Sequence, residues 1–259
     1  MIKSELEIQQ IRKACQITDK AFRRVLGFVK PGVYEYEIEA EITHEFIRNG
    51  ATGHAYEPII ASGANACVLH YMQNNAQCKE GEVILMDFGS EYGNYSSDLS
   101  RTIPVSGRFT PRQRQLYDAV LRIHKECLKL LNPSDLTLDT YHKEVGKIAE
   151  SEFIGLGLFD KTDVANQNSN SPLYKKYFMH GTSHHIGLDT HDLGSRYAPF
   201  AVGMVFTCEP GIYLPEEGIG IRLENDYAIT DTGLVNLMAD IPVEAEEIES
   251  LMQERVAAS

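Results

Sequence analysis

The sequence predicts an α+β protein made of two similar halves, each with helices followed by an antiparallel hairpin. Two observations lead to this prediction. First, helical periodicity alternates with short apolar runs of strand length. Second, the pattern Gly-x-Val-x3-Asp/Glu-x-Gly occurs at residues 81–89 and again at 203–211, and each copy precedes a turn and a second carboxylate, Asp98 or Glu224. Two such halves would pack their hairpins side by side around a pseudo-two-fold axis.

The chain is expected to form a single domain over residues 1–259, with internal halves of about 1–135 and 136–259. Its 259 residues, 43% of them hydrophobic, are enough to bury one sizeable core. Residues 160–172 are polar and rich in Asn and Ser, and their length suits a loop within one domain better than a linker.

Capping and turn residues mark where the expected helices begin and end. Ser4 and Glu7 have the spacing of a capping box, Thr110-Pro111 begins the third helix, and Asn132-Pro133 ends it. The expected helices are 4–27, 35–49, 111–131, 137–155 and 243–257. A strand and turn are expected at 56–70, and further strands at 83–89, 95–105, 203–211 and 220–224.

Composition argues against several classes of partner. The net charge of −13 is unsuited to binding nucleic acid, and it fits poorly with adhesion to anionic lipid. No apolar run reaches membrane-spanning length, and the N-terminus has no signal-peptide core. The five scattered cysteines include no CxxC pair, which suggests free thiols in a reducing cytoplasm. We therefore expect a cytoplasmic protein with neither nucleic acid nor membrane as a partner.

Four carboxylates lie in apolar, strand-like surroundings, and a histidine-rich stretch lies between them. Residues 180–191 contain four of the nine histidines. For any single carboxylate, a salt bridge or backbone hydrogen bonds would offset the several kcal/mol that burial costs. Four of them, symmetrically placed, are neutralised more simply by a shared pair of divalent metals. Such a pair activates water and polarises a carbonyl, and no GxSxG, P-loop or dinucleotide motif offers a different chemistry.

These segments together resemble the pita-bread dinuclear metallopeptidases, and within them aminopeptidase P (Xaa-Pro aminopeptidase). The matching segments are Cys67–Tyr71, Asp87, Asp98–Thr102, His180–His184, Gly187–Asp192, Glu209–Tyr213 and Gly220–Glu224. The resemblance implies the pita-bread fold and hydrolysis of the Xaa-Pro bond at peptide N-termini through a metal-bridged water. It also implies that the substrate is a peptide with proline in second position.

The resemblance also implies a role for each matching position. Asp98 and Glu224 would bridge the two metals, and Glu209 would also act as general base. The implied metal ligands are Asp87, Asp98, His184, Glu209 and Glu224. His70 and His191 would contact the substrate and stabilise the oxyanion. His180, Tyr213 and Arg222 would form the proline pocket. Tyr56 and Leu69 would form the pocket for the N-terminal residue. His185 is expected to be a structural or pocket-lining residue.

Manganese is the metal that such oxygen-rich sites usually hold, with cobalt or zinc able to substitute. The family implies a possible homodimer and an additional N-terminal domain missing from this chain. Two alternatives remain open. The chain could be a prolidase that acts on Xaa-Pro dipeptides, or a non-catalytic pita-bread module that binds peptides. A methionine aminopeptidase fits the His191-Asp192 motif less well, and a metal-independent creatinase-like enzyme would not need the ligand set.

Overall fold

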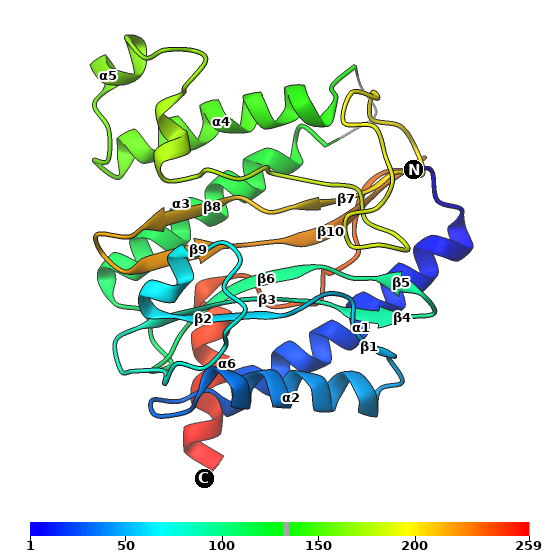
Figure 1. The fold of residues 1–259 in the computed structure, drawn as a ribbon, viewed down its shortest axis with the longest axis vertical. Helices are drawn as coiled ribbons and strands as arrows, with labels where there is room; N and C mark the ends of the chain where they lie inside the picture. Colours follow the sequence, from blue (N-terminus) through cyan, green and yellow to red (C-terminus); the bar gives the residue numbers. More distant parts are fainter. Residues whose placement is uncertain (132–134, 259) are drawn as a thin grey trace.

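The computed structural model describes residues 1–131 and 135–258, and its strands from both halves run across the middle of the molecule (Figure 1). The helices are α1 (Glu5–Phe28), α2 (Glu35–Arg48), α3 (Pro111–Leu128), α4 (Leu138–Gly155), α5 (Lys161–Ala165) and α6 (Ala245–Ala258). The strands are β1 (Gly53–His54), β2 (Ile59–Ser62), β3 (Val83–Phe88), β4 (Ser90–Tyr92), β5 (Tyr95–Ser96), β6 (Leu99–Pro104), β7 (Val205–Cys208), β8 (Gly211–Leu214), β9 (Ile219–Arg222), β10 (Asn225–Thr230) and β11 (Gly233–Asn236). The α+β prediction is confirmed.

The long helices begin where the sequence predicted. Ser4 and Glu7 form the expected capping box at the start of α1, and Thr110 caps α3 in the same way. The stop expected at Asn132-Pro133 lies outside the described residues. The expected loop at 160–172 is partly wrong, because α5 forms one short helix there. Its hydrogen bonds run from the backbone N–H of Val164 and Asp163 to the carbonyl of Asp160, and a single exposed turn of this kind has no hydrophobic period to reveal it.

Each predicted hairpin is present but is broken in the middle. In the first, β3 pairs with β6, whereas the tip strands β4 and β5 pair with each other and with β1 in a separate sheet. In the second, β7 pairs with β10 while β8 pairs with β9. The runs predicted as single strands at 95–105 and 203–211 are therefore each interrupted.

Glycines at the breaks let the chain cross at close range. A Cβ on Gly89 would lie 1.7 Å from the carbonyl oxygen of Ser97, and one on Gly211 would lie 2.9 Å from that of Ile221. Pro210 supplies no backbone donor to a ladder, which also ends β7. Asp98, Glu209 and Glu224 all stand at these breaks, between one strand and the next.

The two halves meet where β6 runs beside β9 and the start of β10. The Glu224 backbone N–H donates to the Ser100 carbonyl at 3.1 Å, and the Arg222 N–H donates to Thr102 Oγ1 at 3.2 Å. Arg101 is fully buried at this junction and donates to the Glu224 carbonyl and to Asn225 Oδ1, each at 2.7 Å. The junction therefore holds the carboxylate-bearing segments of both halves next to each other.

The helices cover the strands, and α3 does so across the boundary expected near residue 135, because it precedes that boundary in the chain but packs on strands that follow it. Helices α1 and α2 pack together and contact the strands of the first half, while α3 packs on strands β7 to β9 of the second (Figure 1). The C-terminal α6 contacts both α1 and α3. Among the described residues, no helix is both long and apolar enough to span a bilayer. All five cysteines are unpaired, and four of them are buried.

We predict that Gly89→Ala destabilises the protein by roughly 3 kcal/mol or more, because the new Cβ collides with backbone rather than with a movable side chain. Urea unfolding followed by circular dichroism measures the loss. The matched control is Gly27→Ala near the end of α1, where nothing lies within 4 Å of the added Cβ and a gain of about 0.5–1 kcal/mol is expected. Similar stabilities for both variants would contradict the close crossing.

Candidate metal centre

A cavity of about 350 Å³ is lined by residues from both halves and contains nearly all the predicted site residues. The predicted residues that line it are Tyr56, Leu69, His70, Asp87, Asp98, His180, His184, His191, Glu209, Arg222 and Glu224. Tyr213 was expected in the pocket wall, but it is fully buried and does not line the cavity. Its hydroxyl instead contacts His180 and Arg222 from behind.

Three of the five predicted ligands converge most tightly. Asp98, His184 and Glu224 each offer one ligand atom, and these atoms lie within 4.8 Å of one another. His184 Nε2 is 3.3 Å from Asp98 Oδ2 and 3.9 Å from Glu209 Oε1. His184 Nδ1 lies 3.0 Å from the His185 carbonyl, which can only accept, so Nδ1 carries a proton, and Nε2 is the ring nitrogen that faces the carboxylates and could bind a metal.

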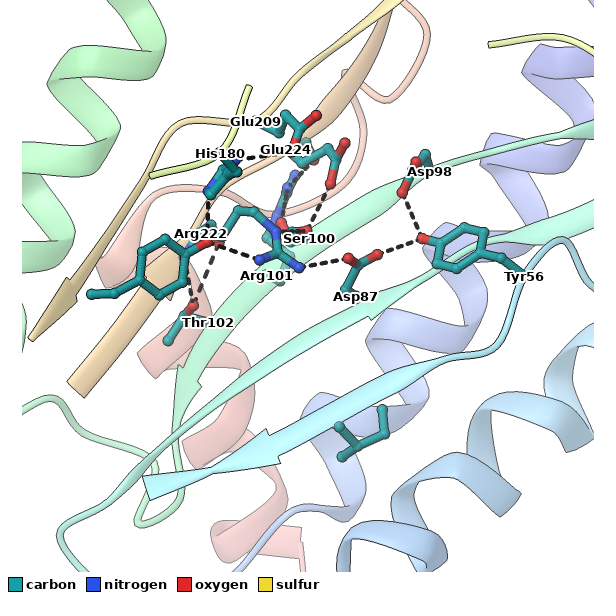
Figure 2. A network of polar contacts seen from close by, with 12 residues as sticks. Tyr56, Asp87, Asp98, Ser100, Arg101, Thr102, His180, Glu209, Arg222 and Glu224 are labelled. Atoms are coloured by element: carbon teal, nitrogen blue, oxygen red, sulfur yellow. Dashed lines mark hydrogen bonds and ion pairs between the residues drawn. The ribbon is translucent and has the colours of Figure 1, made fainter. Parts of the chain in front are cut away.

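Asp87 joins this group through a tyrosine and an arginine (Figure 2). The Tyr56 hydroxyl lies 2.6 Å from Asp87 Oδ1 and 2.5 Å from Asp98 Oδ1. Arg222 Nη2 donates to Asp87 Oδ2 at 2.5 Å. Tyr56 thus lines the cavity as predicted, but its polar end faces the two carboxylates.

Arg222 connects the carboxylates to the neighbouring aromatic wall (Figure 2). Its Nε donates to Ser100 Oγ at 2.7 Å, and Ser100 Oγ in turn donates to Glu224 Oε2 at 2.7 Å. On the other side, Nη1 donates to the Tyr213 hydroxyl at 2.8 Å, which lies 2.8 Å from His180 Nε2. One guanidinium therefore sets the positions of two carboxylates and of the cavity wall.

Sequence reasoning did not identify Ser100 or Asp226 as parts of this site. Ser100 follows Asp98 by two residues and Asp226 follows Glu224 by two. Asp226 Oδ2 accepts a hydrogen bond from the Asp98 backbone N–H at 3.0 Å, while Oδ1 has no hydrogen-bond partner among the described residues. The two-residue spacing that places side chains on one face of a strand was the available signal for both.

The electrostatics of the cavity favour a cation. Burial, together with repulsion by Asp98, Glu209 and Asp87, raises the pKa of Glu224 well above its usual range. Burial raises the pKa of Asp87 to about 6, although Arg222 opposes the shift. Burial is the largest cause of both shifts, and repulsion among the neighbouring carboxylates adds to it. The donors are oxygen and imidazole nitrogen, which is a set that suits divalent metals.

At Glu209 and His184, neighbouring charges shift the pKa against the direction that burial alone would give. Burial tends to raise the pKa of Glu209, but the hydrogen bond from His180 and the charges of His184 and Arg222 outweigh it and lower that pKa. His180 Nδ1 lies 3.5 Å from Glu209 Oε2. Burial tends to lower the pKa of His184, yet contact with Asp98 and Glu209 raises it to about 9.

The remaining predicted histidines differ in their surroundings. The His191 ring meets the His184 ring edge-on with centroids 4.4 Å apart, and burial and the His184 charge lower the His191 pKa. His70 is exposed at the cavity edge. His185 lies outside this cavity and packs against Phe206 with ring centroids 4.7 Å apart, in keeping with the structural role expected of it.

We predict that Glu224→Gln raises the melting temperature of chelator-treated protein at pH 7.5, because it removes one repelling charge and keeps an oxygen to accept from Ser100. When the folded pKa of an acid lies above its unfolded value, the destabilisation is absent below the unfolded pKa and grows as the pH rises through the folded pKa. The gain should therefore shrink at pH 5. Differential scanning fluorimetry at both values tests this, with exposed Glu80→Gln as control. Equal destabilisation at both pH values would contradict the repulsion.

Comparison with known proteins places the chain in a well-populated group. A family model described as metallopeptidase family M24 matches residues 9–231. The Xaa-Pro aminopeptidase of Escherichia coli strain K12 is 42% identical over 97% of this chain and 59% of the relative. Human Xaa-Pro aminopeptidase 3 is 36% identical over 97% of this chain and 51% of the relative. The chain thus spans between half and three-fifths of these curated relatives.

Solved structures agree with the fold. The zinc-substituted Escherichia coli aminopeptidase P in complex with product superposes with a TM-score of 0.91 at 40% identity, over 98% of this chain and 60% of that one. Proline aminopeptidase P II from Yersinia pestis gives a TM-score of 0.90 at 38% identity, over 98% of this chain and 60% of that one. The predicted pita-bread fold is therefore confirmed.

Proposed function

Because this chain belongs to metallopeptidase family M24, we propose that it is a metal-dependent aminopeptidase that hydrolyses the Xaa-Pro bond at peptide N-termini. The observation that supports this most directly is the convergence of Asp98, His184 and Glu224 in one cavity that Asp87 and Glu209 also line. The two relatives compared above are Xaa-Pro aminopeptidases, and this supports the same substrate class for the chain.

Five side chains would hold two divalent ions. The five are Asp87, Asp98, His184, Glu209 and Glu224, which all line the cavity. The mostly oxygen donor set favours Mn²⁺, with Co²⁺ or Zn²⁺ as substitutes. When bound, the ions supply Lewis-acid activation of water and of the scissile carbonyl.

The chain's own groups then move protons and orient the substrate. Glu209 acts as general base: contact with His180 and the charges of His184 and Arg222 keep its carboxylate ionised and able to accept a proton. His191 and His70 line the cavity and would donate to the oxygen that gains charge in the transition state. The depressed pKa of His191 keeps its ring neutral, so that it offers a hydrogen bond without adding charge.

The wall formed by His180 and Arg222 would receive the proline ring, with Tyr213 supporting both from behind. Leu69 would contact the N-terminal residue from the other side of the cavity. Tyr56 is assigned to the same pocket, but its contacts with Asp87 and Asp98 also make it a support for those ligands.

Two alternatives to the aminopeptidase, a prolidase and a peptide-binding module, can be distinguished by substrate preference and metal dependence. A prolidase would use the same metals and prefer the free carboxylate of an Xaa-Pro dipeptide. A peptide-binding module would not depend on metal. A cytoplasmic location, a homodimer and a further N-terminal domain all stay predictions.

The test compares three substrates with Mn²⁺ supplied and then chelated: an Xaa-Pro-Pro tripeptide, an Xaa-Pro dipeptide and a Met-Ala peptide. We expect metal-dependent cleavage of the tripeptide in preference to the others. Preference for the dipeptide would assign a prolidase, and preference for Met-Ala a methionine aminopeptidase. If no substrate is cleaved and no metal is bound, the binding module replaces the enzyme.

We predict that Glu209→Gln lowers kcat by about 10²- to 10⁴-fold while the fold is kept, because the amide cannot accept the proton. Steady-state kinetics on the tripeptide give kcat, and circular dichroism confirms the fold. The control is Glu216→Gln, which changes an exposed glutamate on the β8–β9 turn and should leave kcat unchanged. Near-wild-type turnover in Glu209→Gln would rule out the general-base assignment.

A further inference from the structure

The loop that carries His184 and His191 has two limbs that are anchored differently. The first limb, 184–187, runs alongside β7. The His184 carbonyl accepts from the Thr207 backbone N–H at 3.0 Å, and the Ile186 N–H donates to the Val205 carbonyl at 3.2 Å. His184 is therefore held by the second hairpin itself.

The return limb, 188–193, carries His191 and is held at its start by Asp189, whose carbonyl accepts from the Gly187 N–H at 3.1 Å, and beyond His191 by Asp192. The Asp192 backbone N–H donates to the His185 carbonyl at 2.9 Å. Its carboxylate oxygen Oδ2 accepts from Lys3 Nζ at 2.7 Å, and the two side chains are only 13% and 4% exposed. Asp192 follows His191 directly, so this ion pair acts next to the ring that faces His184.

The ion pair is built into the fold rather than resting on its surface. A Cβ on Gly187 would lie 2.6 Å from Asp192 Oδ2 and 2.8 Å from Lys3 Cε, so the pair packs directly on bare backbone. Gly187 is itself tied to the first hairpin, because its carbonyl accepts from the Ser96 N–H at 2.8 Å. The Lys3 N–H donates to the Gly203 carbonyl at 2.7 Å, which fixes the cation from its own backbone.

A buried ion pair holds a loop in a narrow range of geometries and is costly to break. Removing one partner leaves the other charged and desolvated, which is far more costly than losing an exposed pair. Its geometry is correspondingly narrow, and a shift of about 1 Å in a substrate-contacting group can lower turnover by about 100-fold.

We infer that Lys3 is a positioning residue, which acts through Asp192 to hold His191 against His184 and the substrate. This inference rests on the proposed function for its kinetic consequence. The inference assigns different supports to the two histidines. The proposed metal ligand His184 is held by β7, whereas the proposed substrate contact His191 depends on Lys3.

The test is Lys3→Met, which keeps the length of the side chain and removes its charge. With the Mn²⁺ enzyme and the tripeptide, we expect kcat to fall about 10- to 100-fold, with metal content by mass spectrometry unchanged and a smaller change in KM. Lys3→Arg, which keeps the charge, should recover part of the loss. Arg112→Met, which breaks the exposed ion pair with Glu217, is the matched control and should leave kcat unchanged.

Three results would overturn the inference. One is a proportional loss of metal and kcat in Lys3→Met, which would make the pair a general support of the fold. Another comes from a double-mutant cycle: if Lys3 acts through His191, Lys3→Met should have no further effect on kcat in a His191→Ala background. An undiminished effect there would contradict the assignment, as would unchanged kcat in Lys3→Met alone.

A readout that needs no activity separates this inference from the proposed function. In ¹H–¹⁵N spectra of the Zn²⁺-loaded protein, Lys3→Met should shift the imidazole signals of His191 more than those of His184. If the wild-type protein cleaves no substrate and this pattern is found, the positioning role stands and the proposed function fails. If neither ring responds, the positioning role fails.

Discussion

Repulsion among buried carboxylates at the junction of the two halves is the constraint on which the rest of the site depends. Asp98, Glu209 and Glu224 face one cavity, and burial makes their mutual repulsion costly. Only part of this charge is offset by the protein. Arg222 donates to Asp87 directly and contacts Glu224 through Ser100. Arg101, which is also buried, instead donates to backbone and amide oxygens. The remaining negative charge suits the binding of a cation.

Broken hairpins explain how so many charged groups can be brought together. A continuous strand would point alternate side chains to opposite faces and keep the carboxylates in separate ladders. Interruption beside Gly89 and Gly211 leaves a carboxylate free of the ladder in each half. The contact of β6 with β9 then brings the two halves into register, so that the duplicated hairpin becomes a single site.

The histidine-rich loop forms the other wall of the site, and its anchors come from three distant parts of the chain. Its first limb belongs to the second hairpin, Gly187 is tied to Ser96 of the first, and Asp192 is tied to Lys3 near the N-terminus. His184 and His191 are therefore held by different interactions within one loop.

The sequence by itself determined the features that depend on nearby residues. The capping box at Ser4 and the repeat at 81–89 and 203–211 were readable because capping, periodicity and residue type are local properties. Residue type in specific motifs also identified eleven of the fifteen residues that line the cavity, but not Glu57, Ile59, Met72 or Thr190. Tertiary structure alone decided the breaks in the hairpins, the retreat of Tyr213 behind the wall, the roles of Ser100 and Asp226, and the pairing of Lys3 with Asp192 across 189 positions. These features depend on how closely two backbone segments approach and on which charged groups are buried next to each other. Both are set only when segments distant in the sequence pack together.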